Sequence, residues 1–392
     1  MHLKTVLINL MMFCGVCTTS CKDDKDSVIV DPVDPKLTYY GADLSSVNQV
    51  LDHGGVYRDD GKIQNPYNIF SNHGTNLVRL RLWHTPAWTK AVYGEDGKQL
   101  YNDLADVEKS IMLAKAQGMQ VLLDFHYSDT WADPAKQYVP AAWADIISVD
   151  DLKDSIYNYT YKTLSYLNNK GLMPELVQIG NETNCGMFFS EVKAGFPSCN
   201  ICDGQGKRLG DVMNKAIAAV RAVSAISTTK TKVVLHVADP KNVEWWFDNI
   251  KGVGGVIDFD IVGFSYYPIW HTTVTPDQLS ESISSFKSKY GKEVMILETA
   301  FPFTPDGNDN YTNSFGGSSS FAAYPFTQQG QYDMMRKLEQ ELIDGGGIGL
   351  IYWEPAWITS NMRDLWGTGS SFENCAFFDF NGNTVKAATY ME

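Results

Sequence analysis

The chain has 392 residues, of which 44% are hydrophobic and 12% aromatic, so it can bury a large core. This length exceeds that of most single domains, but barrels of alternating strands and helices reach it through loop insertions. A formal net charge of −14 argues against nucleic-acid and anionic-membrane partners and favours a neutral or cationic ligand.

The first twenty residues are typical of an export signal. Lys4 supplies a positive charge, and residues 6–16 form an apolar run too short to span a membrane. Small residues then lead into Cys21, as at the processing site of bacterial lipoproteins, and an acidic stretch follows. We expect residues 1–20 to be a lipoprotein signal peptide and residues 21–36 a flexible tether. Cys21 would then anchor an outer-membrane lipoprotein at the cell surface; ordinary secretion is the alternative.

Four cysteines remain beyond the signal region: Cys185, Cys199, Cys202 and Cys375. Cys199 and Cys202 have the spacing of zinc ligands, but no second pair of ligands lies nearby in the sequence. An exported location favours a loop disulfide or free buried thiols instead. The sequence does not choose between these states.

Eight short apolar segments along the chain have the character of strands, and most of them end in polar or aromatic residues. They cover residues 37–43, 77–83, 120–126, 176–182, 232–236, 259–265, 294–298 and 349–354. Helical patterns lie between several of them, over residues 104–114, 151–169 and 328–343, and Gly118, Gly171 and Gly345 stand beyond them as predicted C-terminal stops.

Strands that alternate with helices predict a parallel sheet, and eight such units close a (β/α)₈ TIM barrel. We therefore expect an α/β protein with a single catalytic barrel over residues 37–392. An open doubly wound sheet is the alternative. That fold usually has a glycine-rich phosphate-binding turn after its first strand, and residues 42–46 contain none.

All ten tryptophans lie at the C-terminal ends of the predicted strands or in the segments that follow them. Active sites of such barrels form at that face, and flat aromatic rings suit the apolar faces of sugars. Any single tryptophan could instead fill the core of a loop. Their joint placement favours a carbohydrate site.

Two glutamates, Glu182 and Glu298, end the fourth and seventh predicted strands. Strand alternation predicts that Glu182 shares a face with Gln178, and Glu298 with Val294 and Ile296. Strand spacing and tilt predict carboxyl groups on the order of 6 Å apart across the barrel mouth. This value lies between the ~5–5.5 Å of retaining glycosidases and the ~6.5–9.5 Å of inverting ones. The spacing favours glycoside hydrolysis but leaves its stereochemistry open.

Seven segments of the chain, taken together and in order, resemble family 53 glycoside hydrolases. They are residues 41–43, 78–83, 124–129, 131–134, 178–184, 265–268 and 352–357. The resemblance implies an arabinogalactan endo-β-1,4-galactanase with retaining chemistry on a TIM barrel, which would cut pectic galactan. It also implies that Glu182 is the catalytic acid/base and Glu298 the nucleophile.

Two other functions stay open at this point. The first is retaining endo-hydrolysis of another β-1,4-glycan, such as mannan. The second is a surface lipoprotein that binds glycan without cutting it, although a binder would not need Glu182 and Glu298. In each case the expected partner is a polysaccharide, no nucleic acid is expected, and we expect a monomer.

Residues near the two glutamates are expected to support them. We expect Arg81, which is nearer the rim than Arg79, to keep Glu298 ionised. Arg79 could equally be a buried salt-bridge partner or a substrate contact. One of Tyr266 and Tyr267 should donate a hydrogen bond to Glu298.

Further polar and aromatic residues near the strand ends are predicted to bind substrate, although each polar one could instead be structural. Asn181 is expected to contact the sugar 2-hydroxyl. Glu354 is a rival for a catalytic role, but the resemblance marks it as a binding residue. The remaining predicted contacts are Asp43, Asp124, His126, Trp131, His236 and Trp357.

Residues 306–312 carry oxygen-bearing side chains at alternating positions, a pattern that suits a hard cation such as calcium. The resemblance implies a calcium ion between this loop and the one after the eighth strand. Its predicted ligands are Asp306, Asn308, Asn310, Ser370 and Glu373. Asn308 and Asn310 replace an acid and a histidine of the family pattern, which weakens the expected affinity. A simple turn rich in Asn and Asp is the alternative.

Overall fold

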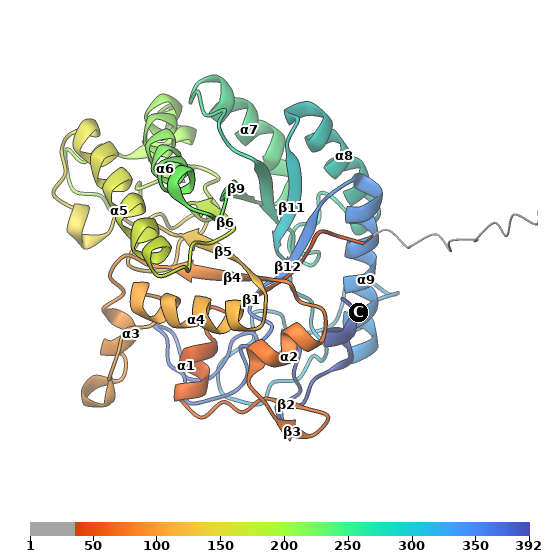
Figure 1. Ribbon diagram of the computed structural model, residues 1–392. Coiled ribbons are helices and arrows are strands. Elements are labelled where there is room, and N and C mark those ends of the chain that lie inside the picture. The colour runs from red at the N-terminus through yellow and green to blue at the C-terminus, as the bar shows by residue number, and fades with distance from the viewer. Residues whose placement is uncertain (1–35) are drawn as a thin grey trace, which may run out of the picture. The chain divides into compact units, whose positions relative to one another are not determined.

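Eight parallel strands form a closed barrel in the computed structural model, which describes residues 36–392 (Figure 1). The predictions for the signal peptide and Cys21 lie outside these residues. The strands are β1 (Tyr39–Asp43), β4 (Leu77–Leu82), β5 (Gln120–Phe125), β6 (Leu176–Ile179), β9 (Lys232–Ala238), β10 (Ile261–Ser265), β11 (Glu293–Glu298) and β12 (Gly349–Tyr352). Six of the predicted segments contain one of them, whereas the predicted segments 232–236 and 294–298 are shorter than β9 and β11. Pairing of β1 with both β4 and β12 closes the ring.

Helices surround the barrel (Figure 1). They are α1 (Val47–Asp52), α2 (Pro66–Asn72), α3 (Trp88–Ala91), α4 (Leu104–Ala116), α5 (Val149–Asn169), α6 (Gly206–Ile226), α7 (Val243–Gly252), α8 (Leu279–Tyr290) and α9 (Gln328–Gly345). The three predicted helices correspond to α4, α5 and α9. Gly345 is the last residue of α9 and not its stop, because Gly346 takes the left-handed conformation there. The TIM barrel prediction is confirmed.

The interior of the barrel is filled by an apolar layer to which every strand contributes. Its members are Tyr39, Leu77, Leu122, Leu176, Val234, Ile261, Met295, Leu297 and Ile351. A much larger core lies outside the sheet, between the strands and the helices. The inner layer closes the barrel below its mouth, so polar side chains above it, at the strand ends, share one enclosed space.

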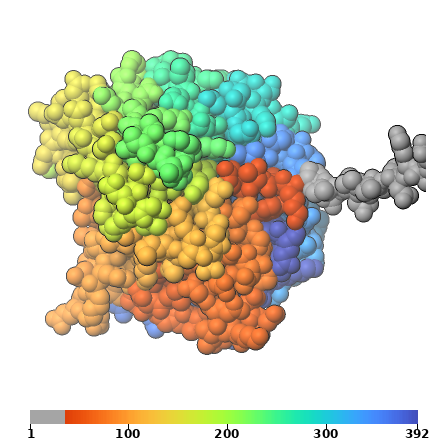
Figure 2. All heavy atoms as spheres, in the orientation of Figure 1, coloured from red at the N-terminus to blue at the C-terminus, as the bar shows by residue number. Residues whose placement is uncertain are grey.

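Two short antiparallel hairpins lie outside the barrel, β2 (Arg58–Asp59) with β3 (Lys62–Ile63), and β7 (Gly186–Met187) with β8 (Cys199–Asn200). The last residues of the chain lie beside the first strand–helix units (Figure 2). There His73 lies 2.6 Å from the Glu392 carboxylate. None of the helices in residues 36–392 has the length and apolar character needed to cross a membrane.

Candidate active site

Glu182 lies just beyond strand β6, in a turn with left-handed backbone. The strand ends at Ile179, and the φ angles of Gly180 and Glu182 are 77° and 45°. Gln178 does point into the barrel, but Glu182 is not part of the strand, so strand alternation does not account for its position. A left-handed conformation costs a non-glycine residue about 1–3 kcal/mol. The surrounding contacts must therefore hold this turn in place.

Glu298 is the last residue of β11 and follows an irregularity in the sheet. Pairing with β10 passes from Ile296 directly to Glu298, so Leu297 is the extra residue of a bulge. Val294 and Ile296 pack in the outer core, whereas Leu297 belongs to the inner layer. The prediction that Val294, Ile296 and Glu298 share a face is therefore wrong. The bulge turns the Glu298 side chain into the barrel mouth.

Two donors hold the Glu298 carboxylate. Arg79 Nη1 lies 2.8 Å from Oε1, and the Tyr267 hydroxyl donates to Oε2 at 2.9 Å. The tyrosine left open by the sequence is thus Tyr267, since the Tyr266 hydroxyl donates to the Val274 carbonyl.

The prediction that Arg81 serves Glu298 is wrong, because Arg79 takes that place. Arg79 starts one layer deeper, but its long side chain brings the guanidinium to the level of the strand ends. Arg81 instead donates to Glu354 Oε1 at 3.2 Å, and its guanidinium carbon lies 4.0 Å from the centre of the Trp131 ring.

The two glutamates lie close together, but the surroundings of their carboxyl groups differ and shift the two pKa values differently. One carboxylate oxygen from each, and a ring nitrogen of His236, lie within 4.8 Å of one another. Burial and then the charge of Glu298 raise the pKa of Glu182 well above its usual value. Burial also raises the pKa of Glu298, but Arg79 and Tyr267 oppose this rise. Glu182 therefore holds a proton more readily than Glu298.

Arg79 is the centre of a buried cluster beneath the two glutamates. Its guanidinium donates to Asp43 at 2.9 Å, to Asp124 at 2.8 Å and to Asn181 Oδ1 at 2.7 Å. The arginine is only 1% exposed, so its charge is compensated by carboxylates and not by water. Of the two roles left open for Arg79, the structure shows that of a buried salt-bridge partner, and one of its partners is Glu298.

A cavity of about 350 Å³ opens above this cluster and contains both glutamates. Besides Glu182 and Glu298, Arg79 and five of the predicted substrate contacts line the cavity. These five are Arg81, His126, Trp131, Asn181 and Tyr267. The sequence did not single out Asp133, Pro134, His271 and Phe372, which also line it, whereas Trp270 and Trp353 are among the tryptophans predicted to lie at this face. The clustering of tryptophans in the segments after the strands was the available signal for these loops.

The other predicted contacts do not line this cavity. Asp43 and Asp124 bind Arg79 below it, and Glu354 binds Arg81 and the Ser46 hydroxyl, at 2.8 Å from the latter. His236 lies beneath Glu182 and is fully buried. Tyr266 and Trp357 point elsewhere, the indole of Trp357 donating to the Gly369 carbonyl. These residues lie behind the cavity wall and do not line the cavity.

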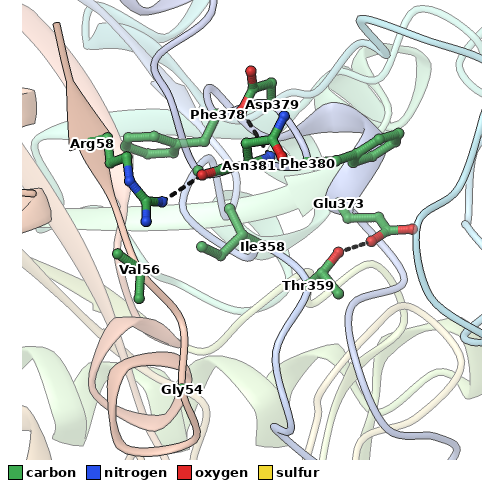
Figure 3. Close-up of a pocket in the computed structure, with 11 residues that line it drawn as sticks. Gly54, Val56, Arg58, Ile358, Thr359, Glu373, Phe378, Asp379, Phe380 and Asn381 are labelled. Carbon is green, nitrogen blue, oxygen red and sulfur yellow. Dashed lines mark hydrogen bonds between the residues drawn. The ribbon is translucent and has the colours of Figure 1, made fainter. Parts of the chain in front are cut away.

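The predicted calcium ligands lie on two loops that meet around Glu373. This buried carboxylate contacts the Thr359 hydroxyl (Figure 3) and accepts the backbone N–H of Asn308 at 2.5 Å. Ser370 is bound by Asp309, which was not predicted, through its backbone N–H at 2.9 Å. Asp306, Asn308 and Asn310 are exposed. The pocket in Figure 3, which Glu373 and Thr359 line, includes neither Glu182 nor Glu298.

The chemistry of this donor set fits a hard cation in part. Glu373 and Asp309 supply carboxylates, and Asn313 Oδ1 is a buried oxygen without a hydrogen-bond partner among the described residues. Asn313 and Glu373 both lie next to Gly307, since a Cβ at that glycine would be 3.2 and 3.3 Å from them. Oxygen ligands of this kind are those that calcium prefers.

Cys185 and Cys202 form a disulfide that closes the β7–β8 hairpin region onto the turn after Glu182. Cys199 and Cys375 are buried free thiols. The zinc interpretation of Cys199 and Cys202 is thereby excluded, because Cys202 is bonded to Cys185. Both states that the sequence left open, a loop disulfide and free buried thiols, occur in this chain.

Comparison with known proteins bears on the whole barrel. The model of Glycosyl hydrolase family 53 matches residues 39–391. An arabinogalactan endo-beta-1,4-galactanase from Cellvibrio japonicus is 43% identical over 343 residues, which cover 87% of this chain and 86% of the relative. An endo-beta-1,4-galactanase from Bacillus subtilis is 32% identical over 385 residues, covering 88% and 83%.

Solved structures give the same answer. A family 53 catalytic domain from Ignisphaera aggregans superposes with a TM-score of 0.79 at 32% identity, covering 92% of this chain and 97% of that domain. The family match over residues 39–391 spans all eight strands, both glutamates and the loops that line the cavity. The chain therefore belongs to glycosyl hydrolase family 53.

Proposed function

We propose that this chain hydrolyses β-1,4-galactosidic linkages within pectic galactan and type I arabinogalactan, with retention of configuration. The observation that carries the retaining mechanism is the proximity of the two carboxylates, whose nearest oxygens lie within 4.8 Å. Retaining enzymes have carboxyl groups about 5–5.5 Å apart, whereas inverting ones leave room for a water between them. The galactan substrate is supported by the names of the relatives from Cellvibrio japonicus and Bacillus subtilis.

The first step is attack of Glu298 on the anomeric carbon. A C–O bond forms between its carboxylate and the sugar, the glycosidic C–O bond breaks, and Glu182 gives its proton to the departing oxygen. Arg79 and Tyr267 keep Glu298 ionised and fix its orientation. Burial and the charge of Glu298 raise the pKa of Glu182, which favours the protonated form that this step requires.

The second step returns both residues to their initial states. Glu182, now a carboxylate, removes a proton from a water, the water oxygen bonds to the anomeric carbon, and the bond to Glu298 breaks. Asn181 is suited to hold the sugar 2-hydroxyl, because Arg79 and the Ala132 carbonyl fix its amide at the cavity wall. Trp131, Trp270 and Trp353 supply flat apolar surfaces for neighbouring sugar rings.

A panel of polysaccharides tests the substrate. We expect the purified barrel to release reducing ends from potato galactan and little from galactomannan or xylan. Glu182→Ala should lower release about 10²–10⁴-fold and Glu298→Ala on the order of 10⁴-fold or more, and both should retain oligosaccharide binding, measured by calorimetry. Absence of products from galactan with the unaltered chain would contradict the proposal. Preference for galactomannan would point to a mannan substrate, and binding without any cleavage would point to a capture protein.

We also propose that a calcium ion joins the loops after β11 and β12. Glu373, Ser370 and the 306–310 segment would hold it, and its contribution would be structural, stabilising loops beside the cavity. Removal of calcium with EDTA should lower the melting temperature, and added CaCl₂ should restore it. An unchanged melting temperature would mean that the hydrogen bonds of Glu373 and Asp309 hold the loops without a metal.

We propose, finally, a monomer attached to the outer membrane through lipidated Cys21. Support for the anchor comes from the residues around that cysteine. Radiolabelled palmitate should be incorporated by the unaltered chain and not by Cys21→Ala, whose product should appear in the medium. Equal labelling of both would contradict the anchor.

A further inference from the structure

We propose that Ser265 and His236 form a positioning pair that orients the Glu182 carboxyl group and favours its ionised form for the second step. This inference rests on the proposed role of Glu182 as the acid/base. Neither residue is placed to touch the reacting atoms, so both act through Glu182.

The contacts form a short chain behind the glutamate. The Ser265 hydroxyl lies 2.6 Å from Glu182 Oε1 and 2.9 Å from His236 Nε2. Ser265 and His236 are both 0% exposed. Ser265 is the last residue of β10 and pairs with Glu298 across the bulge, so the sheet fixes the position from which its hydroxyl reaches Glu182.

The direction of these hydrogen bonds follows from the other nitrogen of His236. Nδ1 faces two N–H donors, the Gln178 side-chain amide at 3.0 Å and the Glu182 backbone N–H at 3.3 Å. Asn181 Oδ1 is also 3.0 Å away, but Arg79 and the Gln178 amide already donate to it, and a protonated Nδ1 could not accept the Glu182 backbone N–H. Nδ1 is therefore the acceptor, which leaves the ring proton on Nε2.

With its proton on Nε2, His236 donates to Ser265 Oγ, and the Ser265 hydroxyl must donate to Glu182. Burial lowers the pKa of His236 well below its usual value, and the charge of Arg79 adds to this, so the ring is neutral. Because the ring is neutral and carries its proton only on Nε2, the direction of these two hydrogen bonds is fixed. Glu182 is thereby held at its carboxyl group by Ser265 and at its backbone N–H by the His236 ring.

The hydroxyl opposes the other influences on Glu182. A donated hydrogen bond stabilises the ionised carboxylate, whereas burial and Glu298 favour the protonated form. The titratable and charged groups that face Glu182 from the surrounding strands and loops are Glu298, Asp133, Arg79, Tyr267 and His236. Arg79 also favours the ionised form but binds Glu298 directly, so Ser265 is the donor that acts on Glu182 alone.

The test is the pH dependence of kcat/KM for galactan hydrolysis in Ser265→Ala. Because the basic limb of this profile reports loss of the Glu182 proton, removing the hydroxyl should move that limb upward by about one pH unit. Thr183→Val is a matched control. It removes a buried hydroxyl that donates to the His236 backbone carbonyl, which the Thr183 backbone N–H also satisfies, so the profile should stay in place.

A second measurement does not depend on activity. The carboxyl of Glu182 can be followed by carbon-13 NMR in protein labelled with glutamate, and assigned by its absence in Glu182→Gln. The pH at the midpoint of its titration should be higher in Ser265→Ala than in the unaltered chain or in Thr183→Val.

An equal midpoint in Ser265→Ala and the unaltered chain would overturn the inference, as would a fall in kcat with an unmoved basic limb. The NMR readout separates this failure from failure of the proposed function. If galactan is not the substrate, the polysaccharide panel fails while the NMR shift is unaffected.

Discussion

The surroundings of Glu298 and Glu182 differ although the two side chains are chemically identical and lie across one cavity. Glu298 is held by the positive charge of Arg79 and by the Tyr267 hydroxyl. Glu182 is held by the neutral Ser265 hydroxyl and faces the charge of Glu298. Two equal carboxylates thus acquire opposite protonation states because only one of them has a cation in contact.

The largest expected effect is that of Glu298→Ala, because it removes the group that bonds to the sugar. Galactan hydrolysis should fall on the order of 10⁴-fold or more. Added azide should restore turnover on an activated aryl galactoside and give a galactosyl azide of inverted configuration. A retained azide would contradict the assignment of Glu298 as the nucleophile.

Glu182→Ala should have a smaller effect that depends on the leaving group. General acid–base catalysis contributes about 10²–10⁴-fold, so hydrolysis of galactan should fall by that factor. Formation of the covalent intermediate from a dinitrophenyl substrate, which needs no proton, should be nearly unaffected. Azide should here give the retained product, measured by proton NMR. Azide products of the same configuration from both variants would contradict the assignment of different roles to Glu182 and Glu298.

Tyr267→Phe tests the support of Glu298. Loss of a hydrogen bond to a charged group costs about 1.5–3 kcal/mol, which corresponds to one to two pKa units. Because Tyr267 lowers the pKa of Glu298, the acidic limb of the kcat/KM profile should rise, the opposite limb from that moved by Ser265→Ala. An unmoved acidic limb would mean that Arg79 alone keeps Glu298 ionised.

Glu354→Gln should have the smallest effect on catalysis, since Glu354 lies behind Arg81 and outside the cavity. Burial raises its pKa to about 7. The folded chain therefore binds this proton more tightly than the unfolded chain, and the free energy of unfolding falls as pH rises from about 4.5 to 7. Urea unfolding at several pH values should show that the free energy of unfolding decreases less over this pH range in the variant than in the unaltered chain. A large loss of kcat would instead restore Glu354 as a catalytic candidate.

Most of the fold could be predicted from the sequence, because each barrel strand is an apolar run with a polar end and the helices between them stop at glycines. The positions of Glu182 and Glu298 followed from the same pattern. Strand alternation could not give their orientation, however. Glu182 sits in a left-handed turn beyond its strand, and Glu298 follows a bulge at Leu297. Both irregularities arise from tertiary contacts that local periodicity does not encode.

The partners of the glutamates were harder to predict than the glutamates. Arg81 is nearer the rim along the strand, but side-chain length and direction decide contact, and Arg79 reaches Glu298. Trp270, His271 and Phe372 line the cavity from loops whose paths have no repeating pattern. Ser265 belongs to a recognised segment, yet its role depends on His236, a residue from the neighbouring strand.

The Cys185–Cys202 disulfide gives the site a dependence on its chemical surroundings. Cys185 follows Glu182 by only three residues, and the bond lies outside the barrel strands, closing a loop with a sequence separation of 17. In a reducing solution the barrel should stay folded, because its apolar core does not involve this bond. The strained turn of Glu182 would lose one of its restraints. The same chain would then be a folded but slower catalyst, so oxidising conditions matter here for turnover more than for the fold.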